Sequence, residues 1–415
     1  MNRLFIAAQA IAVLSLASVA RAQDAAAPAA EAAAPAADTA DQIAKLEGKI
    51  AALEEQYAET KGDVAGLKRL KLSGYMQARY AWQDKGLVNY NKAEATASPD
   101  RDNFFIRRGR FKAVYDADVA QFVLQLDAIP SGLSVKEAYA EVKIPSQLIK
   151  GLAVDAGLQL MPFGYDVGVR SSSDLDLLER YRGAGYWLKG EYDLGATVKG
   201  SYGPINFRGG IFNGNGVDGG YGAAGRDNDQ LKDFIGRLGF DLGFLTGGVS
   251  GWYGKTIDYK AFPNKTYDRN RIGADAQLYL DLLPIGGTAL KGEFIAGKTG
   301  IGTQGSPVTA AYGADPGRAG HAWHATLTQN LGKTFQVAAR YEQFTKNNNL
   351  VATPKTLKSI NELDVALHAY VGGNYKLTAA YWHPMDGQTV GTGTGDPKGT
   401  VKNTDQWVVQ AQAKF

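Results

Sequence analysis

The chain contains no cysteine, so it can form no disulfide, no thiolate metal site and no cysteine nucleophile. Histidine is scarce as well: the four are His321, His324, His368 and His383. No motif sets one of them beside a serine as a hydrolase requires. The formal net charge of +3 over 415 residues gives no support for binding nucleic acid. We therefore predict neither an enzyme nor a nucleic-acid partner, and neither a cofactor nor a metal.

Long hydrophobic runs are also missing, except at the N-terminus. Residues 1–22 carry a positive charge at Arg3, an apolar stretch from Leu4 to Leu16, and the small-x-small triplet Ala20-Arg21-Ala22. This order is typical of a secretory signal peptide, and the apolar stretch is shorter than the ~20 residues of a membrane-spanning helix. Because only helices and closed barrels satisfy their backbone groups in lipid, the rest of the chain could enter a membrane only as a barrel.

Residues 23–37 are rich in alanine and proline, a composition that predicts a disordered linker. Residues 38–69 then show the apolar spacing of three and four residues that is typical of a coiled coil. The a positions are Ile43, Ile50, Tyr57 and Val64, and the d positions are Leu46, Leu53, Thr60 and Leu67. We expect an oligomeric coiled-coil helix, because so narrow an apolar seam needs partners. The alternative is a single helix packed on a neighbouring domain.

From residue 70 to residue 415 the apolar period changes to two, which is the period of a β-strand. Between Asn103 and Asp116, one face carries Phe105, Arg107, Phe111 and Tyr115, and the other carries Ile106, Arg108, Arg110 and Lys112. Such runs are about 10 residues long, as in tilted transmembrane strands. The side chains predicted to face lipid include Phe111, Leu124, Val142, Leu278, Val365 and Val409.

Long polar connections alternate with short turns along this region. The long ones fall at 83–102, 162–184, 213–230, 258–268, 299–319, 346–358 and 384–402. Counting between them gives about sixteen strands, with both ends on the side of the short turns. The last strand closes on Phe415, like the C-terminal signal of outer-membrane barrels. We predict an all-β fold, a transmembrane antiparallel barrel in the bacterial outer membrane, with the helix in the periplasm.

A barrel of about sixteen strands is too wide to fill with side chains, so a water-filled lumen remains. The strand faces predicted to point inward are charged. Their cations include Arg79, Arg108, Arg110, Lys112, Lys199, Arg208, Arg237, Arg271, Arg340 and Lys376, and their acids include Asp127, Glu137, Glu141 and Asp155. The clearest cluster joins Arg108, Arg110 and Lys112 to Arg79. A row of arginines along a lumen attracts anions. The alternative is an ordinary solvated strand face.

The chain resembles the phosphate-selective porins O and P over most of residues 70–415. The resemblance rests on Phe105-Ile106-Arg107-Arg108-Gly109-Arg110-Phe111, Val135-Lys136-Glu137-Ala138-Tyr139, Gly157-Leu158-Gln159 with Pro162-Phe163-Gly164, Ser171-Ser172-Ser173 followed by Glu179-Arg180, and Gly210-Ile211-Phe212-Asn213-Gly214. It implies a homotrimeric outer-membrane channel for small anions of the phosphate class, with an arginine ladder and a third loop folded into the pore.

By this resemblance, Arg107 and Arg108 match paired arginines at the constriction, Asp127 matches an acid facing them, and the folded loop is Met161–Arg182. The loop departs from the family in lacking lysine. It carries Arg170, Arg180 and Arg182 beside Asp174, Asp176 and Glu179. Mixed signs across a constriction are similar to a general porin, so a weak anion preference is expected.

Two other classes were weighed against a channel. An outer-membrane hydrolase would need histidine and serine together, and the spacing of His321 and His324 puts their rings on opposite faces of a strand. A structural protein that tethers the outer membrane to the cell wall would use the coiled coil as a spacer. A single-channel recording separates the second class from a porin.

Overall fold

A computed structural model describes residues 36–83, 103–188, 191–214, 216, 230–258, 262–298, 319–345, 348, 359–385 and 405–415. The predicted signal peptide lies outside these residues. So does the predicted linker, apart from residues 36 and 37, which already belong to a helix. The chain divides into two compact units, residues 1–65 and 66–415, and each is described by itself.

Helix α1 runs from Ala36 to Lys68 and matches the region predicted to be helical. The side chains of its predicted seam, including Leu46, Leu53 and Leu67, are exposed in the single chain. Among the described residues, the apolar side chains of the predicted seam of helix α1 are therefore left exposed. Neither described helix is long and apolar enough to cross a membrane.

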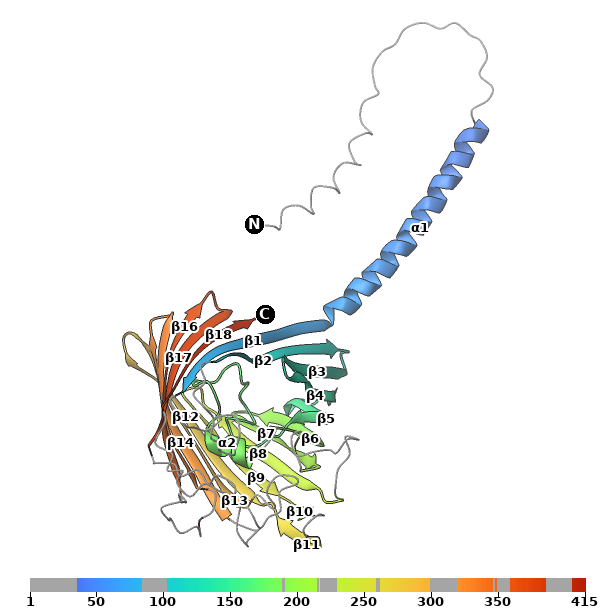
Figure 1. The fold of residues 1–415 in the computed structure, drawn as a ribbon. Coiled ribbons are helices and arrows are strands. Elements are labelled where there is room, and N and C mark those ends of the chain that lie inside the picture. Colours follow the sequence, from blue (N-terminus) through green and yellow to red (C-terminus); the bar gives the residue numbers. More distant parts are fainter. Residues whose placement is uncertain are drawn as a thin grey trace, which may run out of the picture. The chain divides into compact units, whose positions relative to one another are not determined.

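Within the described residues, sixteen strands close into one antiparallel barrel, as predicted, and β1 pairs with β18 (Figure 1). The barrel strands are β1 Leu70–Gln83, β2 Asn103–Asp116, β3 Ala120–Ile129, β4 Gly132–Lys143, β5 Lys150–Leu160, β6 Tyr192–Tyr202, β7 Ile205–Phe212, β8 Asp233–Asp241, β9 Leu245–Tyr253, β12 Arg271–Leu283, β13 Gly286–Lys298, β14 Ala319–Leu331, β15 Phe335–Thr345, β16 Ile360–Val371, β17 Tyr375–Pro384 and β18 Gln406–Lys414. Every hydrogen-bonded neighbour pair in this barrel is antiparallel. Because the barrel is closed, its sheet has no open edge.

A second, two-stranded sheet joins β10 Lys255–Asp258 to β11 Phe262–Asp268. This corrects the sequence analysis, which treats residues 258–268 as a polar loop. Thr256 pairs with Tyr267 and Ile257 with Thr266, so the connection between β9 and β12 continues as a hairpin. Strand β10 has only four residues, and so short an alternation of polar and apolar residues does not predict a strand by itself.

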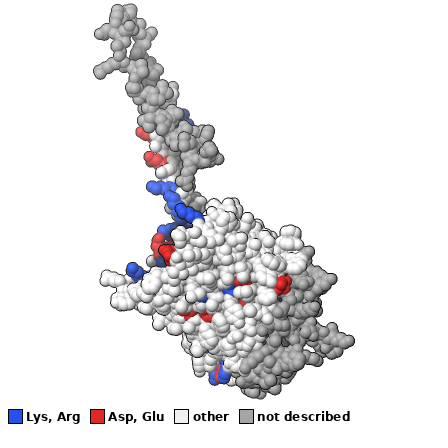
Figure 2. Space-filling view, turned by 90° about the vertical axis from the view of Figure 1, so that its left-hand side faces the viewer, with Lys and Arg blue, Asp and Glu red and all other residues white. Residues whose placement is uncertain are grey.

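The two faces of the barrel wall differ in the way that period two predicts. Phe111, Leu124, Val142 and Val409 are exposed on the outer face, and Leu278 and Val365 lie on that same face. Figure 2 shows one side of the wall, most of which is covered by uncharged atoms. Exposed aromatic side chains lie near both ends of the barrel wall. Those at the end with the short turns are Tyr115, Phe122, Tyr202 and Tyr375, and those at the end with the long connections are Phe104, Phe234, Tyr253 and Trp407. An apolar band between two aromatic girdles is typical of a barrel in a membrane.

Strict alternation fails at one point in β2, and this corrects the predicted faces. Gln77 pairs with Arg108, but the next residue of β1, Ala78, pairs with Ile106, so Arg107 is the extra residue of a β-bulge. The bulge reverses the faces before it. Phe105 therefore packs against the apolar cluster inside the barrel, whereas the period-two pattern placed it on the lipid face with Phe111.

Candidate functional site

The connection between β5 and β6 folds into the barrel, as the resemblance implied. We call residues 161–191 the folded loop. It is longer than the predicted Met161–Arg182, because it continues through the short helix α2, Arg182–Trp187, which packs on β14 and β15 (Figure 1). The apolar side chains Phe163, Val167, Trp187 and Leu188 are buried with residues of the barrel wall.

Small side chains of the wall let the loop approach closely. Leu177 and Leu178 of the loop are buried in one apolar cluster with Ala338, Ala366 and Ala380, which lie on successive strands β15, β16 and β17. Each alanine leaves room that a larger residue would fill. The folded loop therefore lies against the wall on this side of the lumen, and burial of its apolar side chains stabilises that position.

Polar side chains of the wall also hold the backbone of the loop. Lys376 Nζ donates to the carbonyl oxygens of Ser173 and Leu175 at 3.4 and 3.3 Å. Arg340 Nη1 donates to the carbonyl oxygen of Glu179 at 2.9 Å. Neither Arg340 nor Lys376 was among the predicted site residues. Period two correctly points both side chains inward, but no sequence signal shows that a loop crosses in front of them.

Glu179 joins two members of the predicted cluster, Arg79 and Arg108, to Arg107, whereas Arg110 and Lys112 pair with other acids. Its carboxylate accepts hydrogen bonds from Arg79 Nη1 at 2.7 Å, Arg107 Nε at 2.6 Å and Arg108 Nη2 at 2.8 Å. The bulge at Arg107 explains how two consecutive arginines reach the same acid from one strand. Burial alone would raise the pKa of Glu179. The three guanidinium groups outweigh burial and hold that pKa well below its ordinary value.

The acid that faces the arginine pair is thus Glu179 and not Asp127. Asp127 Oδ2 lies 3.4 Å from Arg110 Nε, and its Oδ1 accepts a hydrogen bond from the backbone N–H of Gly109 at 3.0 Å. Arg110 also donates to the hydroxyl of Tyr192 at 2.7 Å. The acid that the resemblance implied is therefore wrong, because the path of the loop decides which acid reaches the arginine pair.

The three arginines of the folded loop hold the loop itself. Arg170 Nη1 lies 2.7 Å from Asp176 Oδ2, Arg180 Nε lies 2.8 Å from Glu191 Oε1, and Arg182 Nη2 lies 2.5 Å from Glu362 Oε2 on β16. Burial raises the pKa of Glu191, but the adjacent guanidinium of Arg180 outweighs burial and lowers that pKa to about 2. Arg170 and Arg180 thereby join residues within the connection, and Arg182 joins it to the wall.

A second set of charges lies on β2 to β7. Lys112 Nζ lies 2.6 Å from Glu137 Oε2. Lys199 Nζ lies 2.6 Å from Glu141 Oε2 and 3.1 Å from Asp155 Oδ2, and Arg208 Nη2 lies 3.2 Å from that same oxygen. These ion pairs join strand to strand across the inner face, so this part of the wall is a belt of alternating charges.

In three pairs of this belt the cation is more exposed than the acid, whereas in the Arg110–Asp127 pair of β2 and β3 the acid is slightly more exposed, at 11% against 7%. The side chain of Lys112 is 30% exposed and that of Glu137 is 11% exposed. For Lys199 and Glu141 the fractions are 29% and 13%, and for Arg208 and Asp155 they are 23% and 0%. The Arg107–Glu179 pair follows the same order, at 27% and 10%. Except in the Arg110–Asp127 pair, water and solutes therefore meet mainly the positive member of each of these pairs.

Two predicted lumen residues are largely shielded from water. Arg237 donates to Asp275 Oδ1 at 2.6 Å, and its side chain is 9% exposed. Arg271 is buried, with its guanidinium carbon 3.9 Å from the centre of the Trp252 ring. Trp252 belongs to the apolar cluster that also holds the loop residue Phe163. Both arginines point inward as predicted, but Arg271 packs against an aromatic ring instead of facing open water.

Solved structures of outer-membrane porins share this fold. An anion-selective porin from Comamonas acidovorans matches with a TM-score of 0.56 and 14% identity, covering 83% of this chain and 99% of that chain. OprB of Pseudomonas putida matches with a TM-score of 0.58 and 11% identity, covering 86% and 97%. The outer-membrane channel DcaP of Acinetobacter baumannii matches with a TM-score of 0.56 and 10% identity, covering 83% and 97%.

These likenesses concern the fold, because the sequence identities are low. No protein-family model matches the chain, and no curated protein matches it. The fold is thus that of a porin barrel, whereas the resemblance to the phosphate-selective O and P group rests on the quoted motifs alone.

Proposed function

We propose that the chain is an outer-membrane porin, a water-filled channel through which small polar solutes diffuse, with a modest preference for anions such as phosphate. The porin fold and the charged inner face support the channel. A sixteen-stranded barrel keeps an aqueous lumen unless something fills it. The folded loop packs on β7 to β9 and β13 to β18 and bonds to β1 and β2, so the partly exposed cations of β2, β6 and β7 mark the side on which water remains. Charged side chains such as Lys112 and Lys199 would be unfavourable on an inner wall without water.

The order of exposure within the ion pairs carries the proposed anion preference. Lys112, Lys199, Arg208 and Arg107 are each 23% to 30% exposed, whereas the acids paired with them are at most 13% exposed. A diffusing ion therefore meets the positive member of these pairs first. Partly exposed guanidinium groups also suit oxyanions, which they bind in a fork.

Other pairs work against this preference and keep it weak. Glu191 is 22% exposed while its partner Arg180 is 6% exposed. Asp174 is 58% exposed beside Lys414, at 35%. In water at about 4 Å a single ion pair is worth only about 1 kcal/mol, so a wide lumen discriminates weakly. A general porin without a preferred sign is the alternative within the same class.

The outer surface supports a place in the outer membrane, and the helix supports an oligomer. The apolar outer face with its two aromatic girdles fits a lipid bilayer. The exposed seam of α1 needs partners of the same kind, and a coiled coil provides them. We propose a homotrimer with α1 in the periplasm, the number three coming from the family resemblance.

Conductance steps in a planar lipid bilayer test the channel. Purified protein at low concentration should give discrete steps of constant size that persist at low voltage. A tethering protein would give a stable oligomer with no steps. Absence of steps from protein that is folded, as judged by its heat-modifiable migration in a gel, would contradict the channel and favour the tether.

A further inference from the structure

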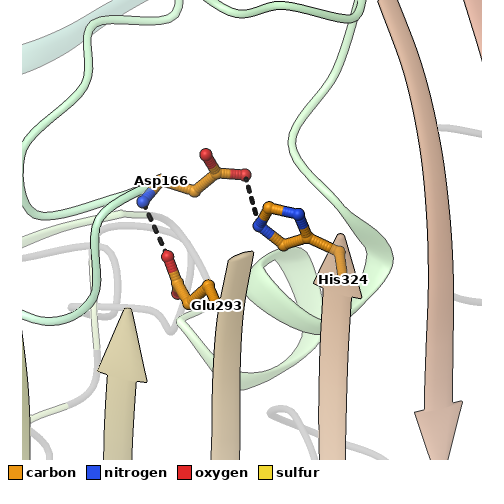
Figure 3. A group of neighbouring side chains, drawn as sticks. All are labelled: Asp166, Glu293 and His324. Atoms are coloured by element: carbon orange, nitrogen blue, oxygen red, sulfur yellow. Dashed lines mark hydrogen bonds and ion pairs between the residues drawn. The ribbon is translucent and has the colours of Figure 1, made fainter. Parts of the chain in front are cut away.

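Three side chains outside the arginine cluster converge at a buried point between the folded loop and the wall (Figure 3). Asp166 comes from the loop, Glu293 from β13 and His324 from β14. One oxygen or nitrogen atom of each lies within 4.8 Å of the others. The three residues are 3%, 3% and 5% exposed. Two carboxylates and an imidazole so close together and so far from water require an explanation.

His324 points an unused nitrogen into this space. Its Nδ1 lies 3.1 Å from the hydroxyl oxygen of Thr326, while its Nε2 has no hydrogen-bond partner among the described residues and lies 3.8 Å from Asp166 Oδ2. With the proton on Nδ1, the ring donates to Thr326 and turns the lone pair of Nε2 toward the carboxylate. Histidines that bind metals are held in this way by a second hydrogen bond at the other nitrogen.

Glu293 is fixed in place on the other side. Its Oε2 accepts hydrogen bonds from the backbone N–H groups of Tyr165 and Asp166, both at 2.8 Å, and its Oε1 accepts one from the Tyr181 hydroxyl at 3.1 Å. Gly164, with φ of +68°, lies against this carboxylate, and a Cβ there would come within 2.4 Å of Oε1. The glycine thus leaves the space that the carboxylate occupies.

We propose that Asp166, Glu293 and His324 bind a divalent transition-metal cation of the zinc class. A carboxylate–imidazole set suits such a metal, whereas magnesium and calcium prefer oxygen ligands alone. Bonds of about 2.1 Å place tetrahedral ligands about 3.4 Å apart, so the 3.8 Å between His324 Nε2 and Asp166 Oδ2 needs a small contraction. Water would complete the coordination.

The charges in the neighbourhood leave a place for the cation. Arg170 Nη1 lies 3.5 Å from Asp166 Oδ1, so a guanidinium group already faces that oxygen, and Arg180 and Arg340 add positive charge nearby. The other oxygen, Oδ2, faces His324. Glu293 brings a second carboxyl group to the same point. A bound cation would join the beginning of the folded loop to β13 and β14, and would therefore stabilise the loop against the wall.

Equilibrium dialysis against Zn²⁺ tests the site. The full chain is refolded with chelator, dialysed against buffered Zn²⁺ or Mg²⁺, and its bound metal is measured by mass spectrometry. The wild type should bind one more Zn²⁺ per chain than His324→Ala, and Mg²⁺ should not replace it. His321→Ala is the matched control, since His321 is on the same strand but bonds to Asn348 instead.

A second variant guards against misfolding. Glu293→Gln keeps the size of the side chain and an oxygen for the backbone N–H groups, and should weaken Zn²⁺ binding at least tenfold. Equal Zn²⁺ binding by wild type and His324→Ala, or by wild type and Glu293→Gln, would overturn the site. Equal binding of Mg²⁺ would overturn the metal class. Because bound metal is read directly, the result does not depend on whether the barrel conducts.

Discussion

Replacement of Glu179 by glutamine should release the folded loop. The Glu179 carboxylate binds Arg79 and Arg108, whose side chains are 2% and 5% exposed, and the more exposed Arg107. Removing one partner of a buried ion pair costs about 3–5 kcal/mol, because the remaining charges stay buried and unpaired. Glutamine also turns an N–H₂ group, a donor, toward guanidinium donors. A loss of 3 kcal/mol raises the ratio of undocked to docked loop roughly a hundredfold.

Open-channel noise in single-channel recordings measures this change, since an undocked loop moves within the lumen. Glu179→Gln should show flickering between conductance levels, whereas the wild type shows steady openings. Glu137→Gln is the matched control. Its ion pair with Lys112 joins β4 to β2 within the wall and does not involve the folded loop, so its loss should leave the loop in place. If Glu179→Gln is as quiet as Glu137→Gln, the arginine cluster does not hold the loop and the reasoning fails.

Three further predictions concern acid, the oligomer and the register of the wall. Burial raises the pKa of Glu191, but Arg180 outweighs burial and lowers that pKa to about 2, so the pair stabilises the loop fully above the ordinary glutamate pKa of about 4.3 and loses this effect as the pH falls toward 2. Open-channel noise recorded from about pH 5 to about pH 2 should therefore rise as the pH falls. Noise that does not depend on pH would refute the prediction. Deleting residues 38–68 should lower the melting temperature of the oligomer in a gel while the barrel stays folded, and an unchanged melting temperature would show that the barrels associate through their walls alone. Lys112→Cys should react with a water-soluble thiol reagent while Phe111→Cys is protected by lipid, because Lys112 is 30% exposed on the inner face and Phe111 lies on the outer face; the reverse result would mean a wrong register.

The barrel could be predicted because its signals are local. Period two follows from the geometry of each strand, so a few neighbouring residues are enough to predict that Val142 and Val409 lie on the outer face of the barrel. The bulge at Arg107 could not be found in this way, since an extra residue shows only against the partner strand. For the same reason Phe105 was assigned to the wrong face.

The candidate site depends on contacts between residues far apart in the chain, and these were predicted least well. Glu179 meets Arg79 across a sequence separation of 100 residues, and Asp166 meets His324 only because the loop folds against β14. The residue types were visible, but their partners depend on the path of the loop. Strand geometry predicts that the rings of His321 and His324 lie on opposite faces, which agrees with the buried His324 and the more exposed His321. It does not predict that the folded loop brings Asp166 to His324.

The reversal potential in a tenfold KCl gradient tests the central claim most directly. The wild type should be weakly anion-selective at low salt, and Lys112→Gln/Lys199→Gln should lose most of that preference, because it removes exposed charges in front of buried acids. Lys143→Gln/Lys298→Gln is the matched control, since these lysines and their acids are similarly exposed, at 36% and 31% and at 43% and 46%. The preference should shrink near 1 M salt, where the Debye length is about 3 Å. A cation-selective wild type, or an unchanged preference in Lys112→Gln/Lys199→Gln, would contradict the account.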